Sequence, residues 1–288
     1  MPENLKALRN RIRSIGKTKK ITRAMEMVSA AKLRKYEGVM KSTRPFLNKI
    51  QELLGRLALS TGAQEHPLFQ RPETGYPLLV FFTSDKGLCG AFNAHLIKRV
   101  TRELEKDPHL RVIVMGRKGR DFLRRHYPER MEDSHVDLGG RLDGTWTDAM
   151  ANHLQEQFLA GVYSRIELLY PHFVSTAVNR PMLQRYLPLE PAAFGVSEEE
   201  SSQAIDYILE PTPERVFEAL LPRFLQTKVF LTLAETYTSE HASRMMAMNN
   251  ATKNCEDLGS SLTLRLNKAR QAAITTEIIE IVSGAEAL

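Results

Sequence analysis

The stretch Met245–Ala273, MMAMNNATKNCEDLGSSLTLRLNKARQAA, carries the pattern that decides the fold. Apolar or small residues recur in it at alternating spacings of three and four: Met245, Met248, Thr252, Cys255, Gly259, Leu262, Leu266, Ala269 and Ala273. Such heptad spacing is typical of a helix that packs lengthwise against another helix in a coiled coil. Because Gly259, Ala269 and Ala273 carry little or no side chain, we expect the partner helix to approach closely there.

The helix that contains this seam is predicted to be unusually long. Thr212 is a good N-cap and Pro213 suits the first helical position, and no later break appears before about Ser283. At 1.5 Å per residue the helix spans on the order of 100 Å, more than a globular domain of this size can cover. Its last turns are apolar on more than one face, so we expect another protein to cover them; they contain Ile274, Ile278, Ile279, Ile281 and Val282.

The partner for this seam is predicted to be a second long helix at the other end of the chain, folded back antiparallel. From Asn4 to about Leu57 the helical stripe contains Leu5, Leu8, Ile12, Ile15, Ile21, Met25, Val28, Phe46, Leu47, Ile50 and Leu54. Pro45 is expected to kink this helix or to end its first part, because proline lacks a backbone donor. The predicted helical segments are residues 1–60 and 211–288.

The N-terminal segment is strongly basic. Residues 1–49 carry fourteen Lys and Arg against three Glu, whereas the formal net charge of the whole chain is only +6. The rest of the chain is therefore net acidic. A basic arm predicts an acidic partner, which could be nucleic acid, an anionic membrane or the carboxylates of another protein.

Gly16-Lys17-Thr18 matches the end of a phosphate-binding loop, but the rest of that loop is missing. Arg11 stands where the motif G-x-x-x-x-G-K-[ST] needs its first glycine, and no apolar strand precedes it. The tripeptide is therefore predicted to lie within a basic helix and not to bind nucleotide.

The middle of the chain, residues 76–191, alternates short apolar runs with helical patterns. This rhythm predicts an α/β fold: a Rossmann-like open domain with a mostly parallel sheet. Two glycine-containing turns follow strands, Ser84–Asn93 and Gly116–Arg120, but neither matches the dinucleotide motif G-x-G-x-x-G. We interpret both as structural turns and expect no cofactor.

Several classes of site and location are disfavoured by the residues. The histidines show no metal-ligand spacing, no G-x-S-x-G motif occurs, and Cys89 and Cys255 form no C-x-x-C pair. No apolar run approaches the ~18 residues of a membrane span, and the N-terminus lacks the apolar core of a secretory signal. We expect no catalytic residue, no metal site and no direct membrane span, in a reducing compartment.

Four stretches, taken together, resemble the gamma subunit of F-type ATP synthases over essentially the whole chain. They are KKITRAMEMVSAAKLRK (Lys19–Lys35), TSDKGLCGAFN (Thr83–Asn93), SRMMAMNNATKN (Ser243–Asn254) and NKARQAAITTEIIEIVSGA (Asn267–Ala285). The resemblance implies a rotor shaft whose paired terminal helices enter the ring of alternating alpha and beta subunits. It implies that the α/β domain forms part of a foot, and that nucleotides are bound and hydrolysed by the ring and not by this chain.

The resemblance also implies partners and a location. Besides the alpha and beta subunits, it implies an epsilon-type foot subunit and the ring of membrane c subunits. The implied location is peripheral on the cytoplasmic face of a bacterial cell membrane, with the matrix or stroma face of an organelle membrane as the alternative.

The resemblance further implies specific contact residues. Those facing an acidic loop of a beta subunit are Lys20, Arg23, Met25 and Lys32, with Cys89 near the same loop. Those that meet the inner surface of the ring are Arg244, Gln271 and Thr275, and those at the membrane ring are Tyr207 and Glu210. From their position beyond the seam, we expect the ring to bury Ile274, Ile278 and Ile281. The chain departs from the family pattern at Ala91 and Ile279.

The residues leave two other classes of protein open. A coiled coil that binds nucleic acid would use the same basic arm, and a steep salt dependence of DNA affinity would support it. An enzyme built on the α/β domain is the second, and titration of the chain with nucleotide would test it.

Overall fold

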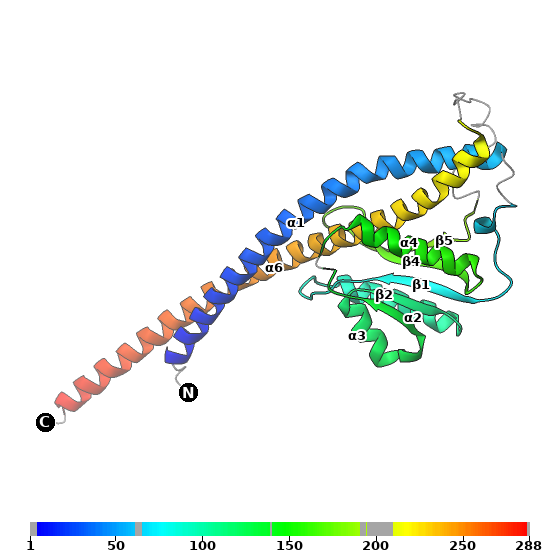
Figure 1. Cartoon of the computed structure of the whole chain (residues 1–288). Coiled ribbons are helices and arrows are strands. Elements are labelled where there is room, and N and C mark those ends of the chain that lie inside the picture. Colours follow the sequence, from blue (N-terminus) through cyan, green and yellow to red (C-terminus); the bar gives the residue numbers. More distant parts are fainter. Residues whose placement is uncertain (1–4, 61–64, 139, 191–193, 195–209, 287–288) are drawn as a thin grey trace. The chain divides into compact units, whose positions relative to one another are not determined.

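The computed structural model describes residues 5–60, 65–138, 140–190, 194 and 210–286 (Figure 1). In chain order the elements are α1 (Leu5–Ser60), η2 (Pro67–Phe69), β1 (Tyr76–Phe82), α2 (Phe92–Lys106), β2 (Arg111–Met115), α3 (Arg117–His126), η3 (Pro128–Arg130), β3 (Met131–His135), α4 (Gly144–Leu159), β4 (Tyr163–Phe173), β5 (Asn179–Leu187) and α6 (Pro213–Glu286). They divide into one unit of residues 1–30 with 244–288 and another of residues 31–243.

The larger unit is built on a five-stranded sheet with the order β3-β2-β1-β4-β5. Strands β1 to β4 pair in parallel, and β5 pairs antiparallel with β4. The predicted mostly parallel α/β sheet is therefore confirmed. Strands β3 and β5 were not predicted, because β3 is short and polar and both are edge strands with many exposed side chains.

Helices cover both faces of this sheet, so its central strands are apolar along nearly their whole length. On one face, α2 contributes a buried stripe of Phe92, Leu96, Val100 and Leu104 to a core with alternate residues of β1 and β2. On the other face, the α6 segment 231–242 is buried throughout. It is tied to the sheet where Ser239 Oγ donates to the Pro171 carbonyl, 3.0 Å away. Arg44 of α1 pairs with Glu235 of α6 at 2.5 Å in the same unit.

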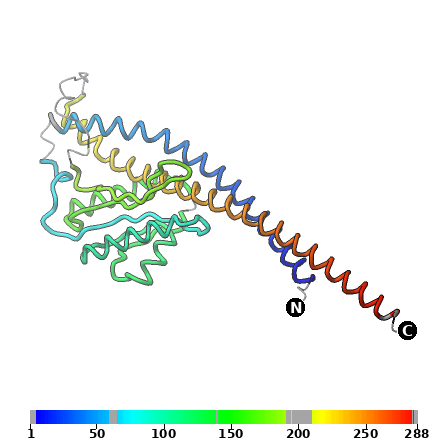
Figure 2. Tube along the Cα trace, turned by 180° about the vertical axis from the view of Figure 1, so that it is seen from behind, coloured from blue at the N-terminus to red at the C-terminus, as the bar shows by residue number. Residues whose placement is uncertain are grey.

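The smaller unit is an antiparallel helix pair, as predicted. Three polar pairs join residues 5–30 of α1 to the C-terminal part of α6: Lys19 Nζ to Glu256 Oε1 at 3.0 Å, Thr22 Oγ1 to Thr252 Oγ1 at 2.8 Å, and Asn249 Nδ2 to Glu26 Oε1 at 2.9 Å. Residue numbers rise on one helix as they fall on the other, which fixes the antiparallel direction. Figures 1 and 2 both show α6 continuing past the N-terminal end of α1.

The predicted seam on α6 is the inward face of this pair. Met248, Thr252 and Leu262 are buried, and the other six seam positions are partly buried. The close approach expected at Gly259 is not seen, because a Cβ built there would still lie 3.9 Å from Ile15 Cγ2. Gly259 instead lines a groove of about 550 Å³ between the two helices, together with Ile12, Ile15 and Gly16 of α1.

The stripe predicted on α1 was wrong at three positions. Ile21, Val28 and Phe46 are 60%, 58% and 54% exposed, and next to the first two, Thr22 and Ser29 take the inward positions. Both inward residues carry hydroxyl groups: Thr22 hydrogen-bonds to α6, and Ser29 hydrogen-bonds to the backbone of its own helix. A search for apolar residues alone therefore misplaces the buried face of α1.

The helix ends differ little from the predictions. Pro213 begins α6, and the Arg215 amide donates to Thr212 Oγ1 at 3.4 Å, so the predicted N-cap is confirmed. Pro45 does not end α1, which continues to Ser60.

Candidate partner-contact sites

The carboxyl edge of the parallel strands, where such sheets often bind ligands, is occupied by the chain's own side chains. Asp85, in the turn after β1, accepts hydrogen bonds from the Arg117 and Asp137 amides at 3.0 and 3.2 Å. Arg117 also pairs with Asp137 at 2.5 Å. A carboxylate therefore sits at the N-terminus of α3, which is the position that a phosphate takes in nucleotide-binding folds.

The glycines of the second turn serve packing at this edge. Gly116 adopts φ 102°, and a Cβ on it would lie 2.3 Å from the Thr83 carbonyl oxygen. The Gly119 amide donates to Thr83 Oγ1 at 3.0 Å, and a Cβ there would lie 2.7 Å from Val114 Cγ2. This geometry supports the interpretation of Gly116–Arg120 as a structural turn.

Replacing Gly119 by Ala is expected to destabilise the chain. The added methyl group must displace packed side chains, and we expect a net loss of about 1–2 kcal/mol despite the better helix propensity of Ala. A matched control is Gly87→Ala, where the nearest neighbour is Lys118 Cε at 3.7 Å. Urea unfolding should show a lower midpoint for the first variant only; equal midpoints would contradict the packing role.

The turn after β1 holds Cys89 inside its own hydrogen-bond network. The thiol is 2% exposed, and the Asn93 amide nitrogen donates to Sγ at 3.2 Å. The exposed apolar side chain of this turn is Leu88, which is 63% exposed and adopts φ 61°. Sequence reasoning missed Leu88, although an apolar residue next to glycine in a polar turn was a visible signal.

The basic arm exposes its cations. In the smaller unit Lys20 and Arg23 are exposed and Met25 is partly buried. Arg23 makes one ion pair within its own helix, to Glu26 at 3.5 Å. Lys32 is also exposed, in the larger unit.

The end of α6 is an apolar surface that α1 does not cover. The pair Lys19–Glu256 sets a register in which Leu5, the first described residue of α1, lies opposite about residue 270. Beyond that point Ile274, Ile278 and Ile281 are 48%, 55% and 71% exposed. Gln271 and Thr275 are exposed on the same turns, so the structure brings these five predicted residues together.

Comparison with known proteins agrees with this geometry. The family model described as ATP synthase matches residues 4–288. The ATP synthase gamma chain of Pelotomaculum thermopropionicum is 40% identical over 286 residues, which cover 99% of each chain. That of Moorella thermoacetica is also 40% identical over 286 residues, with the same coverage.

The chain belongs to the ATP synthase gamma chain family. Among solved structures, a chain from the central stalk and c-ring of the Tetrahymena thermophila mitochondrial ATP synthase matches with a TM-score of 0.62 and 27% identity, covering 80% of this chain and 99% of that one. A chain of the Euglena gracilis mitochondrial enzyme has the same fold, with a TM-score of 0.67 at 18% identity, covering 98% and 94%. The resemblance inferred from the four motifs is confirmed.

As a gamma chain, this protein is the central rotor shaft of an F-type ATP synthase. The shaft couples ion flow through the membrane ring to conformational change at the ring of alpha and beta subunits, and so to ATP synthesis or hydrolysis. No helix in the described part of the gamma chain is long and apolar enough to span a bilayer.

Three further predicted contact residues of the gamma chain differ in exposure. Arg244 is only 6% exposed, so its side chain is largely covered before any partner binds. Glu210 is exposed, just before the start of α6. Tyr207 lies outside the described residues. The contacts of all three stay predictions.

Proposed function

We propose that this gamma chain has no catalytic site and acts by presenting an apolar, unpaired helix end to the ring of alpha and beta subunits. The observation that carries this proposal is the exposure of Ile274, Ile278 and Ile281 beyond the end of α1. Isoleucines at helical spacing are usually buried, and α1 cannot bury these three in the described register. A ring that encloses the helix end would cover them.

The two kinds of side chain at this end suit different tasks in a rotating shaft. Hydrophobic burial is non-directional, so the isoleucines can be held by a ring at any rotational angle. Hydrogen bonds need a defined geometry, so Gln271 and Thr275 would favour particular angles. The isoleucines would therefore centre the shaft, and the polar groups would set its resting positions.

The other partners are assigned by charge and by family. We assign Lys20, Arg23, Met25 and Lys32 to an acidic loop of a beta subunit, with the Cys89 turn beside the same loop. We assign Tyr207 and Glu210 to the membrane c-subunit ring, and the α/β unit to a foot that also binds an epsilon-type subunit. The assigned location is the cytoplasmic face of a bacterial membrane, with an organelle membrane as the alternative.

The experiment that tests the non-catalytic role uses the full-length chain without other subunits. Isothermal titration with ATP and Mg²⁺ should show no micromolar binding, and phosphate release should stay at background. Asp85 already occupies the α3 N-terminus and the Gly-Lys-Thr tripeptide lies within α1, so neither place offers a phosphate cradle. Micromolar binding that is lost in Lys17→Ala would overturn the proposal.

Reversing two charges of the arm is expected to weaken coupling. In the double variant Arg23→Glu with Lys32→Glu, acidic side chains would face the acidic loop of the beta subunit. Each exposed ion pair that is lost contributes only about 0.5 kcal/mol to association. The complex should therefore assemble while ATP yield per ion translocated falls.

The control for this variant is Arg124→Glu with Arg125→Glu, which makes the same charge change on exposed residues of α3. Proton pumping and ATP synthesis measured in membrane vesicles should be reduced for the arm variant and normal for the control. Unchanged coupling in the arm variant would remove the role assigned to the arm.

A further inference from the structure

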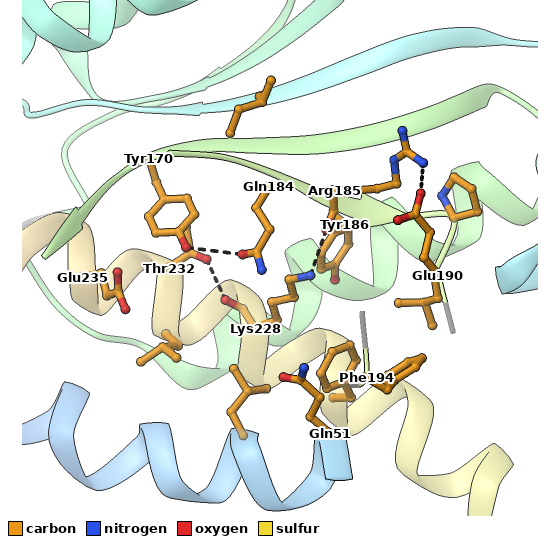
Figure 3. Close-up of a pocket in the computed structure, with 16 residues that line it drawn as sticks. Gln51, Tyr170, Gln184, Arg185, Tyr186, Glu190, Phe194, Lys228, Thr232 and Glu235 are labelled. Atoms are coloured by element: carbon orange, nitrogen blue, oxygen red, sulfur yellow. Dashed lines mark hydrogen bonds and ion pairs between the residues drawn. The ribbon is translucent and has the colours of Figure 1, made fainter. Parts of the chain in front are cut away.

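A cavity of about 320 Å³ lies within the larger unit, between α1, α6 and the last two strands of the sheet (Figure 3). Its size is at the lower end of the range for small-molecule sites. Its apolar wall is formed by Leu47, Leu183, Leu189, Phe194 and Leu231. Lys228 and Gln184 point into it from α6 and β5 (Figure 3).

The carboxylates that line this cavity already pair with arginines. Glu235 pairs with Arg44 at 2.5 Å and shares a hydrogen bond with the His172 ring at 2.8 Å, and Glu190 pairs with Arg185. Among the charged side chains that line the cavity, Lys228 differs from the others because it has no ion pair among the described residues. Because Arg44 and Arg185 pair with the two carboxylates, Lys228 is the lining cation left without an ion-pair partner in the described part of the chain.

The Lys228 ammonium is also short of hydrogen bonds. It is 9% exposed, and within the described residues it donates one hydrogen bond, to the Arg185 carbonyl at 2.9 Å. Nζ otherwise lies 5.7 Å and 5.9 Å from the ring centres of Phe224 and Tyr186, which stabilise a cation but accept no conventional hydrogen bond. An ammonium has three donors, so this one retains capacity for an incoming acceptor.

Burial makes this cation unfavourable in the empty cavity. Loss of solvation lowers the pKa of Lys228 from 10.5 to about 8, so the group is still mostly charged at neutral pH. A buried charge is tolerated when it is paired, and an anion within the cavity would supply the pair.

We propose that this cavity binds a small monocarboxylate with an apolar body, whose carboxylate accepts hydrogen bonds from Lys228. One unpaired cation matches a single negative charge, whereas the second charge of a phosphate dianion would find no unpaired cation among the lining residues. The Gln184 carbonyl oxygen accepts from the Tyr170 hydroxyl at 3.3 Å, which leaves the Gln184 amide nitrogen as a second donor. The leucines and Phe194 cover the apolar body.

The test is calorimetric titration of the full-length chain with decanoate, a probe of about twelve non-hydrogen atoms. For a ligand this small we expect saturable binding with a dissociation constant on the order of 0.1 mM. Lys228→Met keeps an apolar side chain of similar length and should weaken decanoate binding at least tenfold. Lys98→Met, at an exposed lysine of α2, is the matched control and should bind like the parent.

Two further measurements separate charge recognition from general apolar binding. Decan-1-ol has the same chain without the charge, so it should bind more weakly than decanoate and should not distinguish the Lys228 variant from the parent. In the parent chain, decanoate affinity should fall at least tenfold between pH 7 and about pH 9.5 as Lys228 loses its proton. The tyrosines of the cavity, Tyr170 and Tyr186, have raised pKa values because they are buried, so they stay neutral over this range.

Three outcomes would overturn the proposal. The first is the absence of saturable decanoate binding to the parent at about 1 mM, a concentration well above the expected dissociation constant. The second is equal decanoate affinity in a folded Lys228→Met chain, checked by circular dichroism. The third is a pH-independent affinity equal to that of decan-1-ol. Because the chain is used alone, none of these outcomes bears on its role in the complex.

Discussion

Replacing Ile274, Ile278 and Ile281 together by Ser is expected to leave the isolated chain folded and to disable the assembled enzyme. Between 48% and 71% of each side chain is exposed in the chain alone. Full burial of an isoleucine stabilises by about 1.5–3 kcal/mol, so covering the remaining exposed parts should contribute about 3–5 kcal/mol for the three together. Loss of this contribution weakens association by two orders of magnitude or more.

The measurement combines assembly and coupling. Size-exclusion chromatography with alpha and beta subunits should show reduced incorporation of the triple variant, and the complex that forms should hydrolyse ATP without pumping. The free energy of unfolding of the isolated variant should change by less than about 1 kcal/mol, since surface substitutions have small effects. Val174→Ser, at a valine that is 56% exposed outside this helix, is the control and should assemble normally.

Replacing a polar residue at the same end of α6 is expected to have a different effect. Gln271→Ala should assemble and couple, but should turn over more slowly, because it removes a contact with angular preference and little apolar burial. The proposal that these isoleucines centre the shaft would be abandoned if the triple Ser variant assembled and coupled like the parent. It would also be abandoned if a structure of the complex left the three isoleucines in water.

Replacing Lys228 by Met is expected to stabilise the isolated chain at neutral pH. A pKa lowered from 10.5 to about 8 corresponds to a burial penalty of about 3 kcal/mol. The variant leaves the Arg185 carbonyl without this donor, which costs about 1 kcal/mol, so the net gain should be about 2 kcal/mol.

The gain should depend on pH in a defined direction. Below about pH 8 the amine is charged in both folded and unfolded chains, and the full penalty is present. Between pH 8 and 10.5 only the unfolded chain holds the proton, so the stability of the parent rises with pH relative to the variant. The advantage of Lys228→Met should therefore be largest below pH 8. Near pH 10.5 only the cost of the lost hydrogen bond, about 1 kcal/mol, should remain, so the parent should then be the more stable chain.

Urea unfolding at several pH values measures this difference. Lys98→Met is again the control, because that lysine is exposed and should show no such trend. A loss of stability in Lys228→Met at pH 7, or a difference that does not change with pH, would show that the buried ammonium carries no penalty.

Much of the fold could be predicted from local patterns. The three-four spacing of Met245–Ala273 was sufficient to predict the buried face of α6, because the seam positions other than Thr252 are apolar or small. Thr252 was included in the seam by its spacing alone. The same reasoning misplaced Ile21 and Val28, since Thr22 and Ser29 are buried through hydrogen bonds that hydrophobicity does not report. Strands β3 and β5 escaped prediction because an edge strand need not be apolar.

The candidate sites also differ in whether a local sequence pattern reveals them. The exposed isoleucine end was visible in the sequence, because apolar residues there wrap more than one face. The cavity around Lys228 was not visible, because its walls come from segments as far apart as Leu47, Leu183 and Leu231. A lysine in a helical stretch gives no signal of burial until the long-range packing is known.

The three polar pairs between α1 and α6 determine how far α6 extends beyond the N-terminal end of α1. Lys19 with Glu256, Thr22 with Thr252, and Glu26 with Asn249 are satisfied together in one register only. A purely apolar seam with heptad spacing would tolerate a slip of seven residues, which would displace the free end of α6 by about 10 Å relative to α1. Such a slip would break all three polar pairs at once, so these pairs oppose it. They therefore set how far the end of α6 with the three isoleucines projects, and how deeply it enters the protein that encloses it.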